Sequence, residues 1–286
     1  MEAVFIDHRQ PIPTNNEACV LALGVFDGVH VGHQEVIRVA KEIAKSNHIK
    51  LAVMTFEPYP NEVLQKKNKN PTCRLMSLDA KRNFMSELGV DRLYIMKFDL
   101  DFAKFADVDF VQKYIVPLGA VHVVAGFDFR YGYRGTGHMG TIQAHGMNKF
   151  GVTTVEQVSH GCEKISSTLI RESLLQGDVE FVATCLGRFY ETEGRVVNLS
   201  PPHSSVSFLD ILTSGCSLPP EGFYDVCVYL DEKEKIHRTP AYLFVNEQGE
   251  PLVVIHARIR GKVKVRWIRR MSEVRENSRK NQYALG

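Results

Sequence analysis

Two hydrophobic periods alternate along the first two thirds of the chain. Residues Ala18–Leu23 form a nearly continuous apolar run, which predicts a strand buried on both faces of a parallel sheet. In Gln34–Lys45, apolar residues recur at three- and four-residue spacing, which predicts an amphipathic helix packed on that sheet. The Gly-rich segment Gly24–His33 joins the two. Strand, turn and helix in this order indicate one unit of a layered α/β domain.

The same alternation continues to residue 176. Strands separated by helices form a parallel sheet, and such sheets bind ligands at the carboxyl ends of their strands. The Gly-rich segments Gly24–His33 and Gly126–Gly137 both follow predicted strands, so we expect them at this edge. The further strands are expected at Leu51–Phe56, Arg92–Lys97, Ala120–Ala125 and Thr153–Val158, and the further helices at Asp79–Leu88, Asp107–Tyr114, Met139–Lys149 and Ser167–Gln176.

From about Arg188 the pattern changes to short β-rich segments separated by Pro, Gly and Asn. This spacing predicts a small antiparallel barrel or sandwich. The 286 residues suffice for two domains of ~100–200 residues, and we expect these to span residues 1–187 and 188–286. The strands of the second domain are expected at Gly194–Val197, Gly222–Leu230, Ala241–Asn246, Leu252–Ile259 and Lys262–Ile268.

Charge and composition exclude several classes of function. The chain has 35 Lys and Arg residues against 33 Asp and Glu, and a net charge of +2 creates no global field that attracts nucleic acid or an anionic membrane. No segment approaches ~18 uncharged apolar residues, and the N-terminal residues lack the apolar core of a signal peptide. We therefore expect a cytoplasmic protein. The six cysteines form no C-x-x-C pair, which argues against a zinc or redox motif.

The segment between the first strand and helix carries the strongest chemical signal. His30 and His33 stand three residues apart, separated by a Gly, directly before the predicted helix. Imidazole N–H groups beside the free N–H groups of a helix start favour anions, and the arrangement suits a triphosphate. The alternatives are a pair of surface histidines in a turn or a zinc site. The second lacks a third obvious ligand.

This segment, Gly-Val-Phe-Asp-Gly-Val-His-Val-Gly-His, resembles the H-x-G-H signature of the nucleotidyltransferases. Its sequence is similar to that of the bacterial FAD synthetases, the bifunctional riboflavin kinase/FMN adenylyltransferases. Three further segments agree with that family in order: Thr55–Pro60, Gly126–Gly135 and Ile165–Arg171. The resemblance implies a Rossmann-like α/β nucleotidyltransferase domain followed by a small β-barrel. It also implies transfer of AMP from ATP to FMN with Mg²⁺, giving FAD and pyrophosphate.

The resemblance also assigns an ATP site. His30 and His33 would steady the phosphates, and Ser166 or Ser167 would cap a helix whose Arg171 binds the leaving pyrophosphate. Asp27 would contact the ribose or Mg²⁺, or would shape the turn, and the sequence leaves both readings open. Asp128 is a candidate near the metal or the reacting phosphates. The expected ATP-binding residues are Gly24, Phe26, Asp27, Gly28, His30, His33, Ser166, Ser167, Thr168 and Arg171, and the expected catalytic residues are His30, His33, Ser166, Arg171 and Asp128.

The isoalloxazine ring of a flavin is large and flat, so an apolar slot with aromatic walls is expected. The alternative for Phe56 and Phe129 is an ordinary place in the core. Arg130 and Arg134 are candidates for the FMN phosphate. The expected flavin-binding residues are Phe56, Pro58, Pro60, Asp128, Phe129, Arg130 and Tyr131.

The second domain departs from the family pattern. In the family, this β-barrel phosphorylates riboflavin and carries a P-T-A-N motif after a segment like Gly194–Val197. Here that place reads Ser-Pro-Pro-His-Ser-Ser-Val-Ser-Phe-Leu-Asp-Ile, residues 200–211. The family's carboxylate base is expected just before His256, where this chain has Ile255, and an aliphatic side chain accepts no proton. We therefore expect a barrel without kinase activity. The alternatives are a bifunctional enzyme or a non-catalytic flavin- or RNA-binding regulator.

The C-terminal region is locally basic. Lys262, Lys264 and Arg266 alternate with Val263, Val265 and Trp267, which predicts a strand with one solvated face. The alternative is an anion or RNA surface. The expected partners are ATP and FMN, with no membrane and no nucleic acid. The basic residues of this region are Arg258, Arg260, Lys262, Lys264, Arg266, Arg269, Arg270, Arg275, Arg279 and Lys280.

Overall fold

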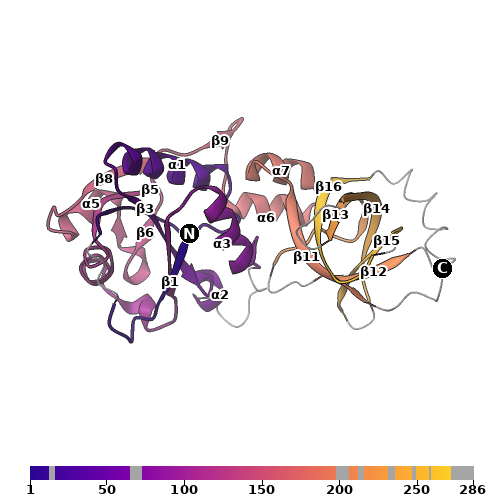
Figure 1. Cartoon of the computed structure of the whole chain (residues 1–286), viewed down its shortest axis with the longest axis horizontal. Helices are drawn as coiled ribbons and strands as arrows, with labels where there is room; N and C mark the ends of the chain where they lie inside the picture. Colours follow the sequence, from indigo (N-terminus) through magenta and orange to yellow (C-terminus); the bar gives the residue numbers. More distant parts are fainter. Residues whose placement is uncertain are drawn as a thin grey trace. The chain divides into compact units, whose positions relative to one another are not determined.

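A computed structural model describes residues 1–12, 17–64, 73–197, 206–211, 216–230, 236–246, 249–257 and 259–271. The chain forms two compact units, Met1–Ile165 and Ser166–Gly286, each of which we describe by itself. The first contains a sheet flanked by helices and the second a closed barrel (Figure 1). The expected α/β domain followed by an antiparallel β-barrel is confirmed.

The first unit is built on a six-stranded, wholly parallel sheet in the order β1-β4-β3-β2-β5-β8. Its central strand β2 (Cys19–Leu23) is buried at all five positions, as its apolar run predicts. Strand β1, at the sheet edge, was not expected from the sequence. The other strands are β1 (Glu2–Ile6), β3 (Lys50–Glu57), β4 (Arg92–Lys97), β5 (Ala120–Gly126) and β8 (Gly151–Val155).

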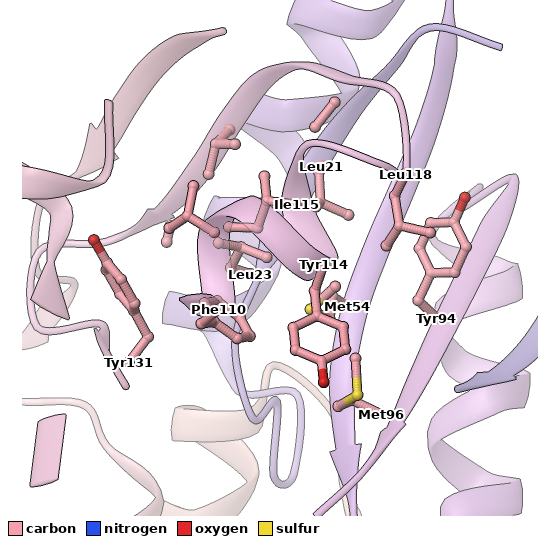
Figure 2. Close-up of a cluster of buried hydrophobic side chains, with 14 of the residues drawn as sticks. Leu21, Leu23, Met54, Tyr94, Met96, Phe110, Tyr114, Ile115, Leu118 and Tyr131 are labelled. Atoms are coloured by element: carbon pink, nitrogen blue, oxygen red, sulfur yellow. The ribbon is translucent and has the colours of Figure 1, made fainter. Parts of the chain in front are cut away.

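Alternate residues of the strands supply two hydrophobic cores, one on each face of the sheet. On one face, Val20 and Ala22 of β2 pack with α1 (Val31–Ser46) and α3 (Leu78–Glu87). On the other, Leu21 and Leu23 pack with the aromatic and aliphatic residues drawn in Figure 2. That second face is covered by α4 (Asp107–Phe110), the π-helical turn Val111–Ile115, and α5 (Met139–His145).

Short elements complete the first unit at its edges. Helix α5 stops before the expected Lys149 because the chain turns there, with Met147 and Asn148 in the left-handed region at φ 53° and 54°. The small elements are α2 (Pro60–Leu64), the 3₁₀ turns Phe102–Lys104 and Tyr133–Gly135, and the hairpins β6 (Arg130–Tyr131) with β7 (Gly137–His138) and β9 (Ser159–His160) with β10 (Glu163–Lys164).

The second unit begins with two helices, α6 (Ser167–Leu175) and α7 (Val179–Leu186), and continues as a closed antiparallel barrel. The strand order is β11-β12-β15-β14-β13-β16. Strand β12 is not among the strands expected from the hydrophobic pattern. The strands are β11 (Tyr190–Val197), β12 (Ser207–Ile211), β13 (Gly222–Leu230), β14 (Ile236–Val245), β15 (Pro251–Ile255) and β16 (Lys262–Arg270).

The division between the units lies between Ile165 and Ser166, earlier than the expected boundary after residue 187. Helix α7 packs on β11 and β16 of the barrel, and it contacts α6 in turn. Its residues Val179, Val182 and Cys185 are fully buried. Because burying apolar surface is what holds a helix to its unit, α6 and α7 belong with the barrel rather than with the sheet.

Candidate functional site

The loop between β2 and α1, residues 24–30, has a strained backbone. Phe26, Gly28 and Val29 all have positive φ angles, of 52°, 75° and 41°. This region is uncommon for a residue with a side chain and costly for a β-branched one such as Val29. The phenyl ring of Phe26 is buried and lies over Gly24, where an added Cβ would meet it at 2.9 Å. Strain of this kind persists only where the surroundings hold the backbone in place.

Three side chains from other positions hold this loop. The Val25 carbonyl accepts hydrogen bonds from Thr55 Oγ1 at 2.8 Å and from Lys81 Nζ at 2.9 Å. The Val29 carbonyl accepts one from Gln34 Nε2 at 2.8 Å. Since β3 supplies Thr55, α3 supplies Lys81 and α1 supplies Gln34, the loop is tied to the sheet and to two helices.

His30 and His33 form a stacked pair at the start of α1. Their ring centroids lie 3.6 Å apart with 19° between the ring planes. His30 caps the helix, because its Nδ1 accepts a hydrogen bond from the His33 backbone N–H at 3.3 Å. This bond assigns the ring proton of neutral His30 to Nε2, which can donate to an anion. Gly32 permits the arrangement, since an added Cβ would lie 3.2 Å from the His30 ring.

His33, the second member of this pair, is half-buried. In the described part of the chain, its Nδ1 is enclosed and has no hydrogen-bond partner. Burial holds the pKa of His33 well below its usual range, and the positive charges of His30, Lys81 and Lys164 act in the same direction. His33 is therefore a neutral imidazole at physiological pH, and an enclosed polar atom of this kind is a mark of a binding site.

Asp27 is also buried, with 3% of its surface exposed. Its Oδ1 accepts a hydrogen bond from the Leu75 backbone N–H at 2.8 Å, which favours the loop-shaping reading that the sequence left open beside the metal reading. Within the described ranges, no three His, Cys, Asp or Glu side chains gather as a metal site. A magnesium ion that keeps several waters needs one or two carboxylates beside substrate phosphates, and Asp27 is a carboxylate of this loop.

Asp128 follows β5 and is exposed. Its carboxylate forms an ion pair with Lys164 Nζ of β10, and the same ammonium lies 4.6 Å from the centre of the Phe127 ring. Lys164 was not among the residues expected from the sequence. Its position directly before Ile165–Arg171 is the signal that was available. The pair adds a cation and a carboxylate to the carboxyl edge of the sheet.

The residues expected to bind the flavin lie in two environments. Phe56 is 7% exposed and belongs to the hydrophobic core, where it packs near Phe102 and Phe110. Tyr131 is 5% exposed, and its hydroxyl is hydrogen-bonded to His145 Nδ1 at 2.9 Å. The structure thus places Phe56 in the core, which is the alternative that the sequence left open for it, and it buries Tyr131 in the same core. Of the rest, Pro58, Arg130 and Arg134 are exposed, and Pro60 and Phe129 are half-buried.

In the second unit, α6 carries the Ser-Ser-Thr segment and Arg171. Ser166 is its N-cap, as expected, with Oγ accepting from the Leu169 backbone N–H at 3.2 Å. Arg171 Nη1 donates to the Ser167 carbonyl at 3.1 Å, which keeps the guanidinium on the first turn of the helix. Ser167 and Thr168 occupy that same turn. At the other end, Arg270 of β16 donates to the Gln176 carbonyl at 3.1 Å. A cation suits the negative end of a helix.

The barrel interior is apolar where the family pattern needs a base. Ile255, the last residue of β15, is fully buried between Ser207 and Ala241 of the neighbouring strands. Trp267 and Tyr224 are also fully buried, with ring centroids 5.1 Å apart. Residues 198–205, which include the first half of the expected P-T-A-N position, lie outside the described residues.

The basic strand β16 has the alternation that the sequence predicts. Val263, Val265 and Trp267 are buried, while the residues between them face outward. Arg266 Nη2 lies 2.6 Å from Glu191 of β11, and Asp225 of β13 pairs with both Arg238 and Arg269. These carboxylates neutralise part of the basic surface, which favours a solvated face over a nucleic-acid surface. Arg258, Arg275, Arg279 and Lys280 lie outside the described residues.

Comparisons with known proteins agree on one family. Residues 12–169 match the family model of FAD synthetase. The chain is 39% identical over 230 residues to the bifunctional riboflavin kinase/FMN adenylyltransferase of Bacillus subtilis (strain 168), an alignment that covers 79% of this chain and 72% of that protein. The protein of the same name from Listeria monocytogenes is 39% identical over 201 residues, which cover 69% of this chain and 63% of that protein.

One solved structure matches both units. It is described as a macrolide-efflux protein from Streptococcus pneumoniae, is 27% identical, and covers 95% of this chain and all of that chain with a TM-score of 0.80. Among the helices of the described residues, none combines the length and apolar character needed to cross a membrane. The family model, the two named relatives and the His-bearing loop before α1 agree: the chain belongs to the FAD synthetase family.

Proposed function

We propose that this chain transfers AMP from ATP to FMN, giving FAD and pyrophosphate, and that it does not phosphorylate riboflavin. The observation that carries the first part is the stacked His30–His33 pair at the N-terminus of α1, held by a strained loop in a member of the FAD synthetase family. A neutral imidazole, a helix N-terminus and an adjacent N–H donor are groups that suit the binding of phosphate oxygens.

In the reaction, a phosphate oxygen of FMN forms a bond to the α-phosphorus of ATP. The bond from that phosphorus to the bridging oxygen breaks, and pyrophosphate leaves with that oxygen and its electron pair. Such a transfer needs positioning and charge neutralisation more than covalent help from the protein. We assign hydrogen bonding to the transferred phosphate to His30 Nε2 and His33. The hydroxyls of Ser166, Ser167 and Thr168 and the guanidinium of Arg171 are assigned to the leaving pyrophosphate.

Mg²⁺ belongs to the same proposal. When bound to the ATP phosphates, it would reduce their negative charge toward the attacking FMN. Asp27 is the carboxylate of the loop that would help to hold it. The Asp128–Lys164 pair is assigned to the reacting phosphates and the flavin edge. A cytoplasmic location, where ATP and FMN are available, completes the proposal.

For FMN, we keep Phe129 and Arg130 as the residues that meet the ligand, together with Pro58 and Pro60 at the end of β3. Phe56 and Tyr131 would act from the core behind them, as the packing of their rings suggests. Arg134 remains a second candidate for the FMN phosphate.

The proposed loss of riboflavin kinase activity rests on Ile255. A kinase must deprotonate the ribityl hydroxyl or orient it, and the fully buried aliphatic side chain at the expected base position does neither. The names of the relatives favour the bifunctional alternative, so a direct assay is needed.

The adenylyl transfer is tested by incubating the purified chain with FMN, ATP and Mg²⁺ and following FAD by its chromatographic retention and pyrophosphate by a coupled assay. We expect equal amounts of both products. Tight flavin binding without any FAD would instead support the non-catalytic regulator.

A further inference from the structure

A buried lysine lies beneath the loop that carries the histidine pair. Lys81, on α3, is 5% exposed and was not among the residues that the sequence singled out. Its Nζ donates to the Val25 carbonyl at 2.9 Å and to Thr55 Oγ1 at 3.2 Å. Thr55, fully buried, itself donates to the same carbonyl at 2.8 Å. The Lys81 ammonium, the Thr55 hydroxyl and the Val25 carbonyl therefore form a triangle of hydrogen bonds directly before Phe26 in the chain.

The charges around Lys81 explain why an ammonium is tolerated there. Burial lowers the pKa of Lys81 below its usual value, and the carboxylates of Asp27, Glu57 and Glu62 oppose that shift, while Arg74 adds to it. Arg74 is itself held by Glu57 at 3.0 Å and by Glu62 at 2.6 Å. A buried lysine is costly unless its charge and its donors are compensated, so its presence needs a reason.

The loop supplies that reason. Phe26 and Val29 hold left-handed backbone conformations that neither side chain favours, and His30 and His33 stack only if the loop keeps this path. The Val25 carbonyl is the last acceptor before the strained residues, and two of the buried donors converge on it.

We propose that Lys81 is a positioning residue for adenylyl transfer: by binding the Val25 carbonyl and the Thr55 hydroxyl, it holds the strained loop in the conformation that stacks His30 on His33. This inference rests on the proposed function of the same site. Lys81 acts through the loop, and its ammonium also contributes positive charge beneath the phosphate site.

The test compares Lys81→Met with Lys41→Met. Both substitutions remove a lysine bound to a backbone carbonyl, because Lys41 Nζ donates to the Leu88 carbonyl at 2.6 Å. Within the described part of the chain, Lys41 makes no hydrogen bond to the loop. We expect Lys81→Met to lower kcat for FAD formation about 10²-fold, the loss expected when reacting groups are misplaced by ~1 Å, and Lys41→Met to keep the wild-type kcat.

A second readout does not depend on activity. Lys81 is one of the charges that lower the pKa of His33, beside His30 and Lys164. The NMR titration of His33 should therefore shift to higher pH in Lys81→Met and stay in place in Lys41→Met. A purely structural role would lower the melting temperature and leave kcat unchanged in the folded variant, and that result would overturn the proposal.

If Lys81→Met does not fold, Thr55→Val provides a second test of the proposal. It removes the hydroxyl of the triangle without removing a charge, and we expect kcat to fall about tenfold, an effect of ~1.4 kcal/mol, while the His33 titration stays in place. A wild-type kcat in Thr55→Val would contradict the proposal. If the wild-type chain itself made no FAD, the proposed function would fail, whereas the His33 titration would still decide whether Lys81 acts on the loop site.

Discussion

The loop after β2 and the end of β15 differ in how far their structure depends on polar side chains. Around the loop, buried polar groups gather: Asp27, His30, Thr55 and Lys81 are each 7% exposed or less. At the end of β15, the buried position carries the aliphatic Ile255, paired with Ser207 and Ala241 of the neighbouring strands. A barrel holds together through apolar packing and its closed ladder of strands, with or without a catalytic group. The strained loop has no such independence, because its conformation depends on its polar anchors.

The largest expected effect in this comparison belongs to the histidine pair. His30→Ala removes both the donor to phosphate and the N-cap of α1, and we expect kcat for FAD formation to fall about 10³-fold, or ~4 kcal/mol of transition-state stabilisation. The lost cap costs about 1 kcal/mol of stability, so the variant stays folded. Steady-state assays with circular dichroism as the folding control make the measurement. A wild-type kcat in folded His30→Ala would remove the pair from the mechanism.

The barrel side of the comparison is tested by Ile255→Glu. Restoring a carboxylate at this position places an unpaired acid among apolar side chains, and we expect a loss of about 3 kcal/mol in stability with no gain of kinase activity. Chemical denaturation followed by Trp267 fluorescence reports on the barrel, since this is the single Trp of the chain. A stable variant that phosphorylates riboflavin would show that Ile255 alone had silenced a kinase site.

The polar anchors of the first unit extend beyond the loop. Asp99 accepts from His8 Nε2 at 2.9 Å, from Arg9 Nη2 at 2.8 Å and from the Phe102 backbone N–H at 2.8 Å, and so joins the segment after β1 to the segment after β4. Burial raises the pKa of Asp99, but the hydrogen bonds from Phe102 and His8 and the charges of His8 and Arg9 outweigh it and hold the pKa at about 2.

Because the folded pKa of Asp99 lies below its unfolded value, its contribution to stability is complete above pH ~4 and is lost as the pH falls toward 2. We expect Asp99→Asn to lower stability by about 2 kcal/mol at pH 7. The difference from wild type should shrink between pH 4 and pH 2 in thermal melts. A constant difference over that range would assign the effect to packing instead of to the charge.

The smallest expected effect concerns the hydrogen bond that joins Arg270 of the barrel to α6. Arg270→Met removes the bond to the Gln176 carbonyl at the C-terminal end of that helix, and we expect the KM for ATP to rise about threefold, or ~0.6 kcal/mol, with kcat little changed. Arg269→Met is the matched control, because Arg269 pairs with Asp225 on the barrel surface. Equal KM values in the two variants would show that the bond from Arg270 to α6 does not affect ATP binding.

Much of the fold follows from sequence pattern alone. The apolar run of β2, the three-and-four spacing of α1 and the alternation of β16 each reflect a local period that the final structure keeps. The pattern did not predict β1, whose outer residue Phe5 is 63% exposed at the sheet edge, or α7, which lies between the two patterns. Edge strands and short linking helices bury little surface of their own, so their pattern is weak.

The site was predicted less completely than the fold. His30, His33, Ser166 and Arg171 stand in motifs that can be recognised along the chain. Lys81 cannot be recognised that way, because a lysine in a charged stretch of helix reads as solvent-exposed, and only the packing of α3 on the sheet brings its ammonium to the Val25 carbonyl. The buried anchors of a strained loop come from distant positions in the sequence, which is why a local pattern does not reveal them.

One measurement tests the central claim of an intact adenylyltransferase beside a barrel without kinase chemistry. The purified chain is given ATP and Mg²⁺ with either FMN or riboflavin, and the flavin products are separated by chromatography over time. We expect FAD from FMN and neither FMN nor FAD from riboflavin. FMN formed from riboflavin, or no FAD from FMN, would contradict it.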